Sequence, residues 1–574
     1  MSKKLLAVFS LLLVLMFGLA GCFSGDSEDV TKDDSTDTAD TSTDTDTSED
    51  TESTNDGGEE KILHLNNSSE PGALHPGLAE GTHDSWPLNH LFEGLTKKSP
   101  DGEVEPGMAE KWETSEDGLE WTFFLKQDVN WSNGDPVTAE DFKYAWLHAL
   151  DPNVGSSYAY QLYYLKGATE YNSADIEAVS DEDLTKLREE VGIEAVDEKT
   201  LKVTLAQPTP YFLDLTSFYT YFPINKNVQE ENPEWYQEAD GYVSNGAFTL
   251  EEWKHKESIT LKKNENYYDK DQINLDGINF LMIEEASTTW QMYRNGELDF
   301  LYPLPQDVVG QMSENDDPEF NIAPDLAIYY YNFNTEKKPF NNAKVRKALS
   351  MAINREDLVE FVAQGGQQPA YGVVPEGIND VDGDFRQNGG ALFESDLEKA
   401  KALLAEGLKE EGMDSMDEFV ILYNTSEGHQ AIASAIQEMW RKNLDVSTKL
   451  ENVEFQVKLD REKAGDFMVS RAGWIGDYVD PMTFMDLWVT DGPYNDANWS
   501  NTEYDSLIEK AKTTMDAAER MDAMHQAEQI LMDEMPVMPI YFYTKPFTVK
   551  PYVKDIYTPI NKYTQFHYAD IEKE

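Results

Sequence analysis

The segment from residue 471 to residue 481, RAGWIGDYVDP, places a cation, a large aromatic ring and a carboxylate within seven positions. Its two glycines let the backbone approach another chain closely, and Trp474 offers a broad apolar surface. Asp477 carries a charge that needs a partner wherever it is buried. The residue types fit either a ligand-binding segment or a surface turn in which Arg471 and Asp477 pair with each other.

The chain has 574 residues, more than one hydrophobic core normally spans, so we expect two or three domains. Its 40% hydrophobic and 12% aromatic content is enough for a large packed interior. Beyond the N-terminus no run of about 18 apolar residues occurs, so nothing there is predicted to span a membrane. Cys22 is the only cysteine, which excludes disulfides, a cysteine metal cluster and an internal thiol nucleophile.

The formal net charge is −63, from 109 acidic and 46 basic residues. Nucleic-acid binding through phosphates needs basic patches, so the composition argues against nucleic acid as a partner. We expect a solvated acidic surface whose self-repulsion is relieved by salt. A saline or alkaline habitat is one hypothesis for this composition.

The first 22 residues have the pattern of a signal peptide. Two lysines precede an apolar stretch over residues 5–17, and small residues stand just before Cys22. The ending resembles a bacterial lipobox, whose cysteine is lipidated after cleavage, although an ordinary signal peptide with a stray cysteine is the alternative. The resemblance implies an extracytoplasmic protein that is anchored to the cell membrane through Cys22 and does not span it.

Residues 23–60 contain 15 acidic residues and one lysine among serine, threonine and glycine. Such a segment cannot bury enough apolar surface to fold, so we predict a disordered acidic linker. Folded sequence begins near residue 61, where an alternating apolar pattern predicts a strand.

Strands and helices are predicted to alternate along the rest of the chain, which gives the α/β class. A turn at residues 133–136 leads to a helix capped by Thr138 with Asp141 three positions on. Further helices are expected from residue 343, after a capping box of Ser395 and Glu398, and over residues 431–443. An apolar strand is expected over residues 537–543, and no internal repeat is evident.

No enzyme motif stands out in the sequence. HExxH, GxSxG, the P-loop and the dinucleotide glycine fingerprint do not occur. The nine histidines show no metal-ligand spacing, and carboxylates are too abundant for one pair to be singled out as catalysts. We therefore expect no enzymatic activity, no cofactor and no metal, and a secreted lipoprotein hydrolase is the alternative from a different class.

Three motifs within residues 108–142, MAEKW, WTFFLK and WSNGDPVTAEDF, resemble the signature of the family 5 extracellular solute-binding proteins. The segment at 471–481 resembles the part of bacterial oligopeptide-binding proteins, the receptors of peptide ABC importers, that holds a peptide's N-terminal ammonium. The likeness extends over nearly all of residues 61–574.

The resemblance implies a periplasmic-binding-protein-like fold of type II, with two lobes that close about a hinge. It also implies three domains, with these boundaries: 61–92, 247–355 and 545–574 for domain I, 93–246 for domain II, and 356–544 for domain III.

The same resemblance implies a set of ligand-binding residues. Asp477 would bind the ligand's ammonium, and Arg471 or His429 its carboxylate. The remaining implied contacts are Glu80, Gly81, Thr82, Tyr158, Tyr331, Phe455, Gly473, Trp474, Ile475 and Tyr543. Without the family resemblance, the sequence around Tyr158 and Tyr331 fits buried core positions as well as it fits ligand contacts. The family's second carboxylate-facing arginine falls on Glu462, which puts the preferred peptide length in doubt.

The function implied is that of a receptor that binds oligopeptides through their backbone and charged ends. It would deliver them as a monomer to the permease subunits of an ABC importer. Relatives on the same fold bind nickel chelates or oligosaccharides, so another solute is the nearest alternative. Peptide length, sequence preference, and a role in nutrition or in signalling are not given by the sequence.

Overall fold

The computed structural model describes residues 60–100, 102–315, 317–514 and 516–573. The predicted signal peptide, Cys22 and nearly all of the acidic linker lie outside these residues. Within the described part of the chain, no helix combines the length and the apolar content that a membrane crossing requires.

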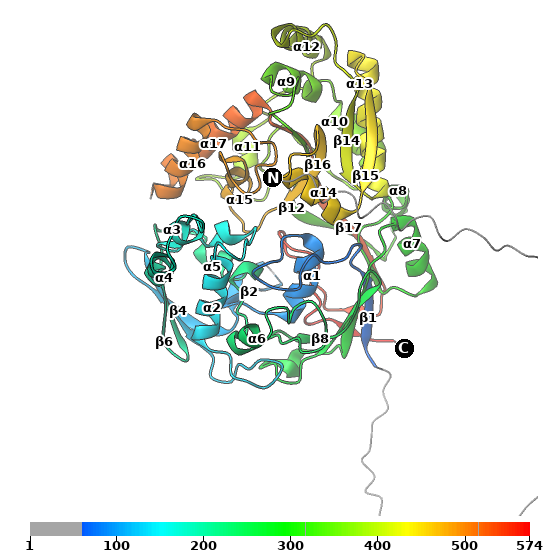
Figure 1. Ribbon diagram of the computed structural model, residues 1–574. Coiled ribbons are helices and arrows are strands. Elements are labelled where there is room, and N and C mark those ends of the chain that lie inside the picture. Colours follow the sequence, from blue (N-terminus) through cyan, green and yellow to red (C-terminus); the bar gives the residue numbers. More distant parts are fainter. Residues whose placement is uncertain (1–59, 101, 316, 515, 574) are drawn as a thin grey trace, which may run out of the picture. The chain divides into compact units, whose positions relative to one another are not determined.

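The structure is built around one large mixed sheet and two smaller antiparallel or mixed sheets (Figure 1). The large sheet contains, in spatial order, β11 (Phe300–Leu301), β17 (Val537–Val549), β12 (Phe320–Phe333), β16 (Val469–Ile475), β14 (Phe419–Asn424) and β15 (Thr448–Val453), with β13 (Gln368–Pro369) paired to β17. A second sheet has the order β1 (Ile62–Asn66), β10 (Gly277–Leu281), β9 (Ser258–Lys263) and β8 (Phe248–Lys254). A third has the order β4 (Ala109–Thr114), β5 (Glu120–Leu125), β7 (Thr200–Thr204) and β6 (Ile193–Asp197). Two short pairs complete the strands: β2 (Thr96–Lys98) with β3 (Val104–Pro106), and β18 (Val553–Lys554) with β19 (Asp570–Ile571).

Helices connect and cover these sheets, so the α/β class is confirmed. The α-helices are α1 (Thr82–Leu91), α2 (Ala139–Ala149), α3 (Ala168–Asn172), α4 (Asp181–Glu190), α5 (Phe212–Leu215), α6 (Lys226–Glu231), α7 (Ala286–Asn295), α8 (Gln306–Glu314), α9 (Ala343–Met351), α10 (Arg355–Leu358), α11 (Phe385–Gly389), α12 (Leu397–Glu411), α13 (Glu427–Leu444), α14 (Phe455–Lys463), α15 (Met482–Met485), α16 (Thr502–Thr513) and α17 (Ala517–Glu534). Short 3-10 or π turns are η1 (Ala159–Leu162), η2 (Tyr219–Tyr221), η3 (Lys270–Gln272), η4 (Val359–Ala363) and η5 (Asp486–Trp488).

Several sequence predictions of local structure are confirmed, and one is wrong. The Thr138 N–H donates to Asp141 Oδ2 at 2.8 Å, as a capping box at the start of α2 requires, and the Thr138 hydroxyl donates to the same oxygen at 2.9 Å. The helix predicted over residues 431–443 begins earlier, at the start of α13. The cap predicted at Ser395 is wrong, because Asp396 caps α12 and the Ser395 hydroxyl instead donates to the Ile353 carbonyl.

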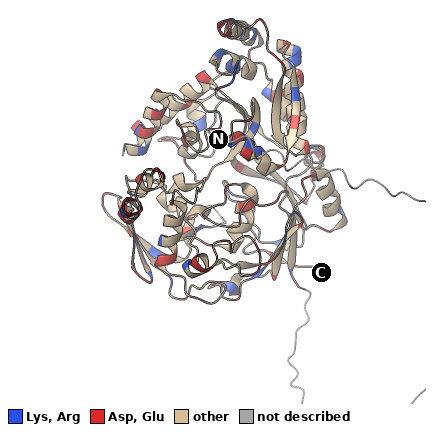
Figure 2. Ribbon diagram, in the orientation of Figure 1, with Lys and Arg blue, Asp and Glu red and all other residues tan. Residues whose placement is uncertain are grey.

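Acidic side chains lie on many of the helices (Figure 2), and α4 is an example that carries no buried residue. The apolar interior lies elsewhere, in a large core that includes β5, α2 and α17 and in a second core between the large sheet and α9, α12 and α13. The periodicity of α9 explains this second core, since Val345, Ala348 and Leu349 all point into it.

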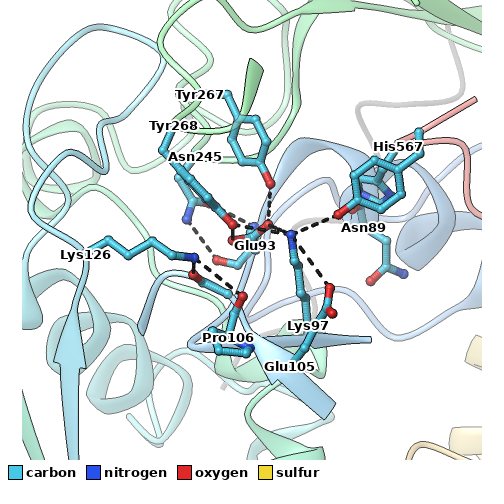
Figure 3. A network of polar contacts seen from close by, with 12 residues as sticks. Asn89, Glu93, Lys97, Glu105, Pro106, Lys126, Asn245, Tyr267, Tyr268 and His567 are labelled. Atoms are coloured by element: carbon cyan, nitrogen blue, oxygen red, sulfur yellow. Dashed lines mark hydrogen bonds and ion pairs between the residues drawn. The ribbon is translucent and has the colours of Figure 1, made fainter. Parts of the chain in front are cut away.

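The two places where the chain is predicted to pass between domains I and II lie side by side (Figure 3). Asn245 donates to the Glu93 carbonyl at 2.9 Å and accepts from the Glu93 N–H at 3.2 Å. The Glu93 carboxylate is buried and accepts hydrogen bonds from Tyr267 at 2.5 Å and Tyr268 at 2.9 Å, with Lys97 3.9 Å away. These contacts link the two passages directly to each other. The three-domain division itself stays a prediction.

Candidate functional site: a cavity along β16

A cavity of about 810 Å³ lies beside the C-terminal half of β16. Twelve of the thirteen residues predicted to contact a ligand line it, and they come from β16, β17, α14, the start of α13, the start of α1 and the turn before η1. They are Glu80, Gly81, Thr82, Tyr158, His429, Phe455, Arg471, Gly473, Trp474, Ile475, Asp477 and Tyr543.

Tyr331 is the exception. It lies fully buried in the core between the large sheet and its helices, while Tyr330 lines the cavity. Successive side chains of a strand point to opposite faces of the sheet, so a run of three tyrosines cannot direct neighbouring rings to one side. The sequence identified the aromatic strand but selected the wrong tyrosine.

One edge of β16 is open along the cavity. β12 pairs with β16 over its whole length, from Phe333 opposite Val469 to Ala327 opposite Ile475. On the other side β14 pairs with β16 only at Val469 and Ser470. The Gly476 N–H donates to the Leu326 carbonyl of β12, so by alternation the backbone groups of residues 471, 473 and 475 face the other edge.

Asp477 follows directly at the end of this edge and is 7% exposed. Its Oδ2 accepts a hydrogen bond from Gln161 Nε2 at 2.5 Å and from the Tyr160 hydroxyl at 3.4 Å. No lysine, arginine or histidine among the described residues forms an ion pair with it, and burial raises the pKa of Asp477 well above its ordinary value. The site therefore holds an acid whose charged form is disfavoured by burial, and a cation placed beside Asp477 would stabilise the ionised carboxylate.

An aromatic wall stands beside Asp477. The Tyr158 ring is stacked on Trp474 with centroids 6.3 Å apart, and Tyr494 meets Trp474 edge-on at 5.0 Å. Tyr494 also contacts Tyr158 and Tyr160. Such a wall excludes water from the carboxylate and strengthens its attraction for a cation.

Arg471 lies 9% exposed at the other end of β16, and it does not pair with Asp477. Its guanidinium donates to the Tyr543 hydroxyl at 2.5 Å and to Asn424 Oδ1 at 3.3 Å, and it lies 4.6 Å from the centre of the Tyr329 ring. Its Nε has no partner among the described residues. The surface turn considered from the sequence is thereby excluded, because both charges are buried and each has separate contacts.

His429 lies in the first turn of α13, where Ser426 is the cap and accepts from the His429 N–H. Its Nδ1 lies 3.4 Å from the Tyr329 hydroxyl. Burial, with the positive charges of Arg471 and Lys458 nearby, lowers the pKa of His429 well below its ordinary value. The imidazole is therefore neutral in this cavity and can act as a hydrogen-bonding group beside the guanidinium.

Glu80 and Gly81, just before α1, and Thr82, its first residue, lie beside α14 in the cavity lining. Lys463 donates to Glu80 at 2.5 Å and to the Ser157 hydroxyl at 3.0 Å. A Cβ on Gly81 would lie 3.3 Å from the Phe455 ring, so this position has room for little more than glycine. Loop and helix therefore form one wall.

Several cavity residues were not predicted from the sequence, among them Lys458, Tyr494, Asp496 and Lys562. Gln161, which contacts Asp477, was not predicted either. For Lys458 a signal existed, since Phe455, Lys458, Leu459 and Glu462 recur at the spacing of one helical face. Gln161 had no such signal, because its role depends on a contact with a residue 316 positions away.

Comparison with known proteins identifies the class. Residues 103–496 match the family described as bacterial extracellular solute-binding proteins, family 5, and the chain belongs to this family. It is 42% identical over 518 residues to the oligopeptide-binding protein OppA of Bacillus subtilis, covering 88% of this chain and 92% of that protein. It is 39% identical over 512 residues to the dipeptide-binding protein DppE of the same organism, covering 89% and 92%.

Solved structures share the fold over nearly the whole described chain. The crystal structure of Haemophilus influenzae OppA in complex with the peptide RPPGFSPFR has a TM-score of 0.81 at 32% identity and covers 90% of this chain and 100% of its own. Escherichia coli MppA, a murein tripeptide-binding protein, also scores 0.81, whereas its unliganded open form scores 0.60. The arrangement of the lobes in the present structure is therefore nearer to the first MppA structure than to the open one.

Proposed function

We propose that this protein is an extracytoplasmic receptor that binds oligopeptides in the cavity along β16 and delivers them to the permease of an ABC importer. The observation that carries the proposal is the open edge of β16, which ends at a buried carboxylate without a counter-charge. Membership of the solute-binding family and the likeness to peptide-bound OppA support it.

An extended peptide fits this arrangement through features that all peptides share. Its backbone can pair with the free edge at residues 471, 473 and 475 like an added strand, independently of its sequence. Its amino terminus supplies the ammonium for Asp477. Arg471, with the neutral His429 beside it, would serve the carboxylate, and water can fill the remaining volume around different side chains.

The test is to identify what the purified protein carries. Native mass spectrometry of the folded protein, followed by denaturation and sequencing of released molecules, should give a mixture of peptides. Release of a metal chelate or an oligosaccharide would contradict the peptide assignment. Shorter fragments appearing when added peptides are incubated with the protein would instead favour a hydrolase.

The receptor is further proposed to be a monomer that is held at the membrane by a lipid on Cys22. The periplasmic relatives from Escherichia coli and Salmonella support an extracytoplasmic location. The acidic linker would then let the folded part stand off from the membrane and reach the permease. We assign no catalytic role to the site.

A further inference from the structure

The inner face of α14 places a buried ion pair in the cavity wall. Lys458 and Glu462 lie one helical turn apart, both line the cavity, and their side chains form a salt bridge at 4% and 2% exposure. One carboxylate oxygen, Glu462 Oε2, is engaged by Lys458, while Oε1 is buried and has no hydrogen-bond partner among the described residues. A buried acceptor left in this state is costly, so it indicates a missing donor.

A second carboxylate lies close to this pair. Asp496 lines the same cavity, and burial together with the negative charge of Glu462 raises the pKa of Asp496 to about 8. Lys463, the other cation of this wall, is engaged by Glu80 at 2.5 Å. Two lysines therefore serve the carboxylates of Glu462 and Glu80, and Asp496 is left with a raised pKa and without a cation paired to it among the described residues.

The cavity as a whole has the same bias. Among the described residues, eight carboxylates line it against three lysine or arginine side chains. His429 does not supply a cation for Asp496, because its imidazole is neutral. Within the described part of the chain, no three histidine, cysteine or acidic side chains are grouped to hold a metal ion, so the geometry favours an organic cation.

We propose that Glu462 and Asp496 form a subsite for a cationic side chain of the ligand, separate from the position of its amino terminus at Asp477. This assignment rests on the proposed peptide-receptor function and adds a substrate class to it, namely peptides with a lysine- or arginine-like residue at one fixed position. An ammonium there supplies the missing donor to Glu462 Oε1 and restores the charge of Asp496.

The experiment uses a set of penta-alanine peptides in which one alanine, at each position in turn, is replaced by lysine. Each peptide is compared with the peptide that carries norleucine at the same position. Norleucine keeps the chain of methylenes and removes the charge. Affinities are measured by calorimetry at low and at high salt. At one position, lysine should bind about ten- to a hundredfold more tightly than norleucine, as expected for a hydrogen bond to a charged group.

Asp496→Asn should remove most of this preference while the norleucine peptides bind as before. The matched control is Asp491→Asn, because Asp491 is exposed on the same loop and has a positive φ that asparagine tolerates. Glu462→Gln leaves Lys458 without its counter-charge. This variant should therefore bind a peptide with glutamate at that position more tightly than the peptide with norleucine there.

The subsite is overturned if alanine and norleucine peptides bind but no position prefers lysine. It is also overturned if Asp491→Asn reduces the preference as much as Asp496→Asn, or if high salt abolishes it, since either result indicates a long-range field. If none of the peptides binds the wild type, the peptide-receptor function fails, which is a distinct outcome.

Discussion

Gln161 Nε2 lies 2.5 Å from Asp477 Oδ2 and joins two segments that are 316 positions apart in the sequence. The contact brings the turn η1, in predicted domain II, against the end of β16, in predicted domain III. Tyr164 and Tyr478 make a second contact between the same segments, with hydroxyl groups 3.1 Å apart. These two contacts join the segment around η1 to the end of β16, where Asp477 is buried.

Asp477 should be the residue on which peptide affinity depends most. Asp477→Asn keeps the shape and removes the charge, and breaking a buried pair costs about 3–5 kcal/mol, which is roughly a hundred- to several-thousand-fold in Kd. N-acetylation of the peptide should weaken binding to the wild type similarly. In the variant, acetylation should matter much less, because the pair is already lost.

Calorimetry on this double cycle is the measurement, with Asp491→Asn as the control for loss of an exposed acid. Equal affinity of the wild type for acetylated and free peptides would show that the site does not recognise an amino terminus.

Affinity should increase with pH until the ligand amine itself loses its proton near pH 8. Burial raises the pKa of Asp477 in the ligand-free cavity, whereas a bound ammonium requires the ionised carboxylate. Below that raised pKa, binding must therefore release a proton, and it weakens as the pH falls. Binding enthalpies in two buffers of different ionisation enthalpy report the released proton. If the peptide affinity of Asp477→Asn depends on pH in the same way as that of the wild type, Asp477 is not the group that releases the proton.

The same shift has the opposite consequence for the stability of the ligand-free protein. The folded state holds the Asp477 proton more tightly than the unfolded chain, so the free energy of unfolding falls as the pH rises through the raised pKa. At neutral pH, Asp477→Asn should stabilise the empty protein by about 1 kcal/mol. Urea unfolding of both proteins at several pH values measures this, and destabilisation by the substitution would be evidence against a strained carboxylate.

Arg471 and His429 should distinguish free from amidated peptide C-termini at one peptide length only. With the amino terminus held at Asp477, as we propose, only one peptide length would bring the carboxylate to the guanidinium. Affinities of free and amidated peptides of two to eight residues provide the test. If amidation has the same effect at every length, the carboxylate remains in solvent.

Cys22→Ala should release the protein from the membrane or leave it unprocessed. The prediction follows from the lipobox-like sequence before the only cysteine. Fractionation of cells, with detection of the lipid by mass spectrometry, compares the variant with the wild type. Retention of a processed Cys22→Ala protein at the membrane would remove the anchor assignment.

The buried pair of Arg520 and Asp480 should matter for stability. The guanidinium donates to both carboxylate oxygens, at 2.7 and 2.9 Å. Arg520→Met leaves Asp480 buried without its partner and should cost about 3–5 kcal/mol. Lys186→Met, which breaks an exposed pair with Glu182, is the control and should cost less than about 1 kcal/mol. Equal denaturation midpoints for the two variants would contradict this ranking.

The sequence predicted those parts of the site whose residues are contiguous. The segment 471–477 was identified because aromatic, glycine and acidic residues follow a short strand, and all of this segment's predicted contacts line the cavity. The sequence did not predict which side chains of a strand line the cavity, because this depends on the face to which each side chain points. Tyr330 of β12 lines the cavity, whereas the predicted Tyr331 is buried in the core. The sequence also did not predict Gln161 and Asp496, because their environment is created by segments hundreds of positions away or by a neighbouring charge. Local sequence patterns predict helix and strand periodicity and helix caps, but they do not predict contacts between segments that are far apart in the sequence.

The open edge of β16 has a consequence for the behaviour of the protein in a crowded compartment. An unpaired strand edge is a template for association with any extended chain, including unfolded proteins and other copies of the same receptor. Here the edge runs along a cavity that is also lined by Phe455 of α14, Trp474 and Tyr158. We expect this placement to favour an extended chain that can enter the cavity over a strand that belongs to a folded protein. The edge that can pair with a peptide backbone is thus set apart from the association that an exposed strand edge invites.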